Sequence, residues 1–105
     1  MNQVAETILE QLGGHTLIAM IGAHSFTADG DSLIFKLPSN ITKNRIKAVK
    51  ISLTPADDYT VTFYAIHGYN VKVVAEHDGI YCDQLQAVFE DETGLLTSLV
   101  GKTVA

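Results

Sequence analysis

A chain of 105 residues with 47% hydrophobic and 18% charged residues predicts a single folded domain over residues 1–105 and excludes a largely disordered protein. The only cysteine is Cys82, which excludes an intramolecular disulfide and a multi-cysteine zinc site and favours a reducing cytoplasm. The net charge of -5 and the pI near 5.1 argue against strong nonspecific binding to nucleic acid.

The amino-terminal segment predicts an amphipathic helix over residues 2–12. Val4, Ile8 and Leu12 are spaced four apart, as one apolar stripe requires, and Gly13-Gly14 should end the helix. This segment has no basic leader before an apolar run, and no window approaches about 20 apolar residues. Secretion and membrane insertion are therefore not expected.

The middle of the chain predicts five strands. The apolar run over residues 15–21 indicates a buried strand, which bends at Gly22 and continues to Thr27. A turn at residues 28–31 leads to a second strand over 32–37, and the two form a hairpin. Further alternating segments follow over residues 45–53, 59–66 and 69–76. In the last of these, Tyr69, Val71, Val73 and Ala75 should share one face.

After residue 78 the apolar spacing becomes helical. Tyr81, Leu85 and Phe89 recur every four residues, Asp78 is a candidate cap, and Gly94 should end the helix. The predicted fold is α+β: a five-stranded antiparallel meander sheet with N-terminal and C-terminal helices packed on one face. The open face would carry Ile34, Lys50, Thr60, Thr62, Tyr64 and Lys72.

Four segments together resemble a family of short proteins encoded by bacteriophages and mobile elements: LGGHTLIAMIGAHSF, LIFKLP, TKNRIKAVKISL and IYCDQLQAVFEDETGLLTSL. The resemblance spans nearly the whole chain, although His24 stands where a cation would be expected. It implies a cytoplasmic setting in a bacterial host cell and supplies no catalytic residue.

The segment before the third predicted strand carries the chain's main concentration of positive charge. Cations together with small polar side chains suit phosphate contacts, and aromatic rings can stack on bases. The candidate nucleic-acid or phosphate-binding residues are Lys43, Arg45, Lys47, Lys50 and Tyr64. The alternative interpretation is that lysines on an edge strand block pairing with other sheets.

Acidic residues crowd the last third of the chain and form the candidate protein-interaction surface. They are Asp83, Glu90, Asp91 and Glu92. A solvated helix face is the alternative interpretation.

Catalytic and metal chemistry have little support in the sequence. No two of the four histidines stand at the spacing of a helical ligand pair, and Cys82 has carboxylates beside it that disfavour a thiolate. We therefore expect no catalytic residues, no metal and no cofactor.

The expected function is that of a small non-enzymatic protein that engages and modulates a host or phage protein, as a monomer or homodimer. A nucleic-acid-binding accessory factor using residues 43–50 is the alternative, and a small enzyme or metal-binding protein comes third.

Overall fold

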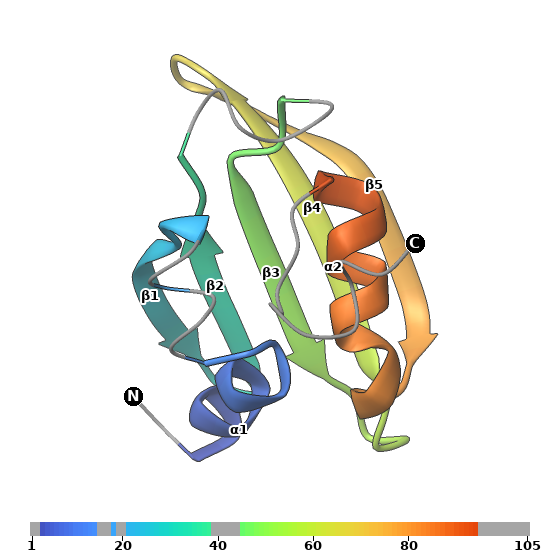
Figure 1. The fold of residues 1–105 in the computed structure, drawn as a ribbon. Helices are drawn as coiled ribbons and strands as arrows, with labels where there is room; N and C mark the ends of the chain where they lie inside the picture. The colour runs from blue at the N-terminus through green and yellow to red at the C-terminus, as the bar shows by residue number, and fades with distance from the viewer. Residues whose placement is uncertain (1–2, 15–17, 19–20, 39–44, 95–105) are drawn as a thin grey trace, which may run out of the picture.

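The computed structural model describes residues 3–14, 18, 21–38 and 45–94, and it confirms the predicted α+β fold. The elements are α1 (Gln3–Gln11), β1 (His24–Asp29), β2 (Ser32–Lys36), β3 (Ala48–Leu53), β4 (Tyr59–His67), β5 (Asn70–Ile80), the 3-10 helix η3 (Cys82–Gln84) and α2 (Leu85–Thr93). The strands form one antiparallel sheet in the order β1-β2-β3-β4-β5. Both helices lie on the same side of this sheet, with α1 near β2 and α2 over β4 and β5 (Figure 1).

The core lies between the two helices and one face of the sheet. The helices contribute Ala5, Ile8, Leu12, Leu85 and Phe89, and the strands contribute Leu33, Phe35, Val49, Ile51, Val61 and Phe63. Each of these side chains is at most 1% exposed. The strand residues alternate along β2, β3 and β4, so the opposite face of the sheet stays outside this core. We call that opposite side the open face.

Glycines set the ends of the helices and the tight turns. At the end of α1, the amide of Gly14 donates to the Leu9 carbonyl (2.9 Å) and that of Gly13 donates to Glu10 (3.1 Å), which is the Schellman arrangement. Gly68, with φ 61°, is the first residue of the two-residue loop between β4 and β5, as a type II′ hairpin turn requires. The predicted helix end at Gly13-Gly14 and the turn after His67 are confirmed.

The prediction for the first apolar run is wrong at its described residues. The amide of Ile18 donates to the Gly14 carbonyl (3.3 Å), and that of Gly22 donates to Ile18 (3.1 Å); bonds to the fourth residue back are typical of helical turns and not of a strand. Residues 15–17, 19 and 20 of the predicted strand lie outside the described residues. A short apolar run fits a buried helical turn as well as a strand, and here the turns leave Ile21 in the core. The first strand, β1, begins only at His24.

The strand β5 carries a bulge that the sequence prediction lacked. Phe63 pairs with Ala75 while the next residue, Tyr64, pairs with Val73, so Val74 is an extra residue on β5. Paired residues project to the same side of a sheet, which places Ala75 on the core side and Val73 on the open face. The prediction that Ala75 shares a face with Val71 and Val73 is therefore wrong.

The same bulge overturns the predicted position of Lys72. Lys72 pairs with the buried Ala65, so it projects to the helix side of the sheet, and not to the open face.

Asp78 is also not the cap of the C-terminal helix. It lies within β5, where its carboxylate accepts a hydrogen bond from Thr60 (3.0 Å).

Candidate functional site

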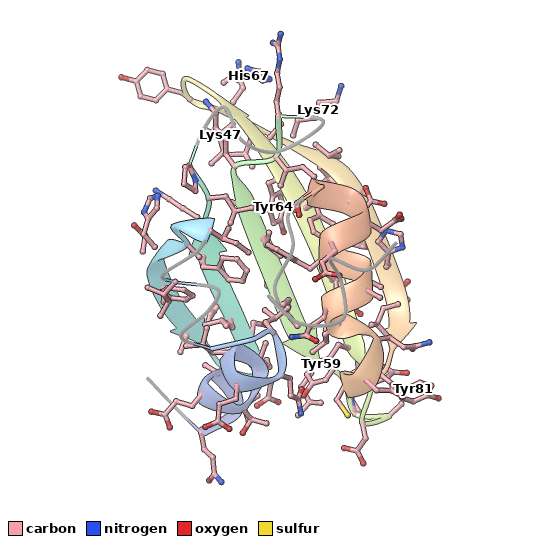
Figure 2. All side chains as sticks on the ribbon, in the orientation of Figure 1. Lys47, Tyr59, Tyr64, His67, Lys72 and Tyr81 are labelled. Atoms are coloured by element: carbon pink, nitrogen blue, oxygen red, sulfur yellow. The ribbon has the colours of Figure 1, made fainter. Side chains whose placement is uncertain are left out.

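Three basic side chains from separate elements meet around one open hollow at the end of the sheet where β4 turns into β5. Arg45 precedes β3, His67 ends β4 and Lys72 lies near the start of β5. Ala65, Val73 and Val74 complete the lining, and the hollow measures about 320 Å³. We call it the basic hollow. Figure 2 shows His67 and Lys72 at this end together with Lys47, far from Tyr59 and Tyr81 at the other end.

The charges around the basic hollow are not neutralised by the described part of the chain. No carboxylate lines the hollow, and neither Arg45 nor Lys72 forms an ion pair with any described residue. Because the whole protein has a net charge of -5, this positive region stands out against an acidic background. An uncompensated cluster of this kind attracts anions.

Arg45 reaches the hollow from an unusual backbone conformation. Its φ of 56° lies in the left-handed region, which costs a residue with a Cβ about 1 kcal/mol. Two residues later, Lys47 fixes the start of β3, because its amide donates to the Tyr64 carbonyl and its carbonyl accepts from Leu37, both at 2.8 Å. The segment from 45 to 47 is therefore anchored to its neighbours on both sides.

The structure separates the predicted basic residues. Arg45 lines the hollow, whereas Lys50 lies within β3 on the open face, between Ile34 and Thr62. Tyr64 also projects to the open face, and Lys43 lies outside the described residues. The edge-strand interpretation of these lysines is wrong for Lys50, because β3 is the central strand of the sheet.

An apolar patch covers the open face at the same end of the sheet. Two adjacent cross-strand pairs, Tyr64 with Val73 and Ile66 with Val71, make up this β4–β5 patch. Val71 and Val73 are 63% and 52% exposed, which is unusual for two neighbouring valines on one face. The patch and the basic hollow therefore lie on opposite faces of the same hairpin.

The strand β5 is also an edge of the sheet. The Tyr64 carbonyl accepts from the amide of Lys47, on the side of β3, so the pairs Tyr64–Val73 and Ile66–Val71 are non-hydrogen-bonded and alternate with hydrogen-bonded pairs along the hairpin. This alternation directs the backbone N–H and C=O groups of Val71 and Val73 away from β4, toward the free edge. Among the described residues, the same two positions thus combine exposed side chains with backbone groups that face no neighbouring strand.

The predicted acidic surface is divided. Asp83 and Asp91 are exposed, whereas Glu92 accepts a 2.9 Å contact from Nε2 of His77 on β5, and Glu90 is half-buried and has interactions of its own. Consecutive residues on a helix point in different directions, so residues 90–92 do not form one surface.

The remaining titratable side chains were also compared with the requirements of a metal site. Within the described ranges, no group of three or more His, Cys, Asp or Glu residues is placed to hold a metal ion. Cys82 is exposed in η3, and His77 lies inside β5. Burial raises the pKa of Tyr59, with a further contribution from Cys82, and its hydroxyl is engaged by Gln11.

Comparison of the chain with family models, curated proteins and solved structures found no match. None of the described helices is long and apolar enough to cross a membrane.

The sequence prediction did not include two of the three basic residues of the hollow, His67 and Lys72. His67 and Lys72 are more than twenty positions from Arg45, and only the pairing of β3, β4 and β5 brings the three together. The two-residue loop at Gly68 was the available signal, since it fixes which residues face each other. The bulge at Val74, which decides the face of Lys72, has no such signal.

Proposed function

We propose that this protein is a small non-enzymatic binding protein that engages another protein by accepting an extended segment as an additional strand beside β5. The observation that supports this most directly is the coincidence at Val71 and Val73 of exposed apolar side chains with backbone groups directed to a free sheet edge. An added strand would satisfy those backbone groups, and its alternate side chains would cover the β4–β5 patch.

The charge at this end of the sheet defines the chemistry of the partner. A strand beside the first residues of β5 passes close to Lys72, and Arg45 and His67 line the same hollow. The partner segment that fits is therefore extended, apolar at alternate positions on one face, and acidic on the other. The resemblance to bacteriophage-encoded proteins supports a host or phage protein in a bacterial cytoplasm as the source of this segment.

The test is selection from a library of random peptides, followed by mapping of the selected peptides on the isotope-labelled protein by NMR. We expect selected peptides to alternate apolar and acidic residues and to protect the amides of Val71 and Val73 from hydrogen exchange. Replacing both valines with lysine should weaken peptide binding at least about tenfold, because each buried valine contributes about 1.5 kcal/mol.

Tyr81→Lys is the matched control, because Tyr81 is 58% exposed at the opposite end of the sheet. It should leave peptide binding unchanged. Selected peptides that map to α2 would contradict the proposal. So would a dimer of this chain, seen in sedimentation, that the two lysine substitutions abolish, since the occupant of the edge would then be a second copy.

Nucleic-acid binding is the second candidate, and the basic hollow is the observation that favours it. Lys50 and Tyr64 lie on the open face. A nucleic-acid strand that contacted them and also the hollow would therefore have to pass around the end of the β4–β5 hairpin. Titration of labelled single-stranded and duplex DNA at low salt tests this candidate. No binding by the native chain removes this candidate, and binding that survives loss of Arg45 and Lys72 would exclude the basic hollow as the interface.

A further inference from the structure

We propose that the basic hollow is a binding site for a phosphate group, held by Arg45, His67 and Lys72. This inference does not depend on a strand docking beside β5. It uses the helix side of the hairpin, whereas the β4–β5 patch uses the open face.

The first argument is convergence. The three donors come from three elements that the sheet brings together, so the backbone of β3, β4 and β5 fixes their spacing. Solvated cations that serve only solubility are normally dispersed among carboxylates. Here two permanent cations and an imidazole share one hollow without an acidic residue in its lining.

The second argument is the match between donors and ligand. A guanidinium presents a planar fork that binds two phosphate oxygens, and an ammonium acts as a compact charge for a third. A phosphate group has enough oxygens for Arg45, Lys72 and His67 together. A carboxylate presents its two oxygens in one plane, whereas the oxygens of a phosphate point in several directions, which suits donors that come from three separate elements.

The third argument concerns size and lining. The hollow of about 320 Å³ is far larger than the roughly 30 Å³ that a water molecule occupies in the liquid. Ala65 and Val74, which lie on the helix side of the sheet, provide an apolar wall beside the cations. This arrangement fits the carbon part of a phosphate ester next to its charged group, so the ligand class is an organic phosphate.

The experiment is a titration of the isotope-labelled protein, followed by NMR, with inorganic phosphate, thymidine 5′-monophosphate and an oligothymidylate, each up to about 10 mM phosphate. Sodium acetate at equal ionic strength is the carboxylate control. We expect phosphate and the nucleotide to shift the amides of Ala65, Lys72 and Val74, the nucleotide at lower concentration, and acetate to have little effect.

The variants separate a built site from general attraction of anions. Arg45→Gln and Lys72→Gln should each weaken phosphate binding about tenfold, because a charge-assisted hydrogen bond is lost. His67→Gln should weaken it less. Lys50→Gln removes the same charge from the open face and should leave binding unchanged. Unaltered melting temperatures would show that all four variants are folded.

Each outcome decides the proposal. Absence of shifts with both phosphate and the nucleotide overturns it, as does an equal loss of binding in Lys50→Gln and Lys72→Gln, or acetate binding as tightly as phosphate. Nucleotide binding with no tighter binding of the oligothymidylate supports the site and removes the nucleic-acid candidate. Much tighter binding of the oligothymidylate, lost in Arg45→Gln, supports both.

Discussion

The hydroxyl of Tyr59 donates a 2.9 Å hydrogen bond to Oε1 of Gln11, and it thereby ties the start of β4 to the last residue of α1. Tyr59 is 6% exposed, and this burial raises its pKa above the ordinary 10.0. A charge–charge interaction with Cys82 raises the pKa further. The packing of α1 against β4 therefore affects the pKa of Tyr59.

Tyr59 should lose its phenolic proton at higher pH than an unfolded tyrosine. Since the native state then holds a proton that the unfolded chain has lost, this contribution to stability is complete below pH 10 and declines as pH rises beyond it. Tyrosinate absorbance, followed during alkaline titration of the folded protein, should contain a late component that is missing in Tyr59→Phe. A titration curve identical in the two proteins would contradict the assignment.

The contact between His77 and Glu92 should contribute only modestly to stability. It joins β5 to α2 at 2.9 Å, but the two side chains are 37% and 20% exposed. We expect a coupling free energy of about 0.5 kcal/mol in a double-mutant cycle with His77→Gln and Glu92→Gln, measured by urea unfolding at low salt. The coupling should shrink at high salt. A coupling above about 2 kcal/mol would show that the pair is shielded from water.

Phe35 should be among the most sensitive core positions. It is fully buried, and its ring centroid lies 5.4 Å from that of Phe26 and 6.1 Å from that of Phe89. Phe35→Ala should lower the free energy of unfolding by about 4 kcal/mol, because it leaves a cavity between the sheet and α2. Phe26→Ala, at a half-buried position, is the comparison and should cost less. Equal losses would mean that the cavity at Phe35 collapses.

The left-handed backbone conformation of Arg45 should lower the free energy of unfolding relative to a glycine at the same position. Glycine adopts a φ of 56° without a Cβ penalty, so Arg45→Gly should raise the free energy of unfolding by about 0.5 kcal/mol, whereas Arg45→Ala should give no gain. Urea unfolding of the two variants measures the difference. A loss of stability in Arg45→Gly equal to that in Arg45→Ala would show that side-chain contacts outweigh the backbone strain.

Much of the fold was predictable because alternation and glycine placement carry strong local signals. The inward sets of β2, β3 and β4 follow from the period of two, as in β4, where Tyr59, Val61, Phe63 and Ala65 are buried. Gly94 ends α2 with a φ of 76°, as expected of a left-handed cap. These features depend only on residues close together in the sequence.

The helical turns before β1 and the grouping of residues in the basic hollow could not be predicted, because they depend on contacts between residues far apart in the sequence. The apolar run before β1 suits either a strand or buried helical turns, and packing of Ile21 into the core decides between them. The composition of the basic hollow depends on a register that skips one residue on β5. Basic residues near position 45 were identified from the sequence, but their grouping with Lys72 was not.

The extra residue at Val74 divides the β4–β5 hairpin into two parts, one that packs against α2 and one that ends in the tight turn. On one side of it, substitutions in β5 disturb the interior shared with α2, so evolution or design has little freedom there. On the other side, residues 70–73 lie beyond that interior, and removing Val74 would keep their faces as they are, because Phe63 already pairs with Ala75 and Tyr64 with Val73. If Val74 instead paired with Tyr64, every residue between it and the turn would shift by one position, and Lys72 would exchange faces with Val71 and Val73.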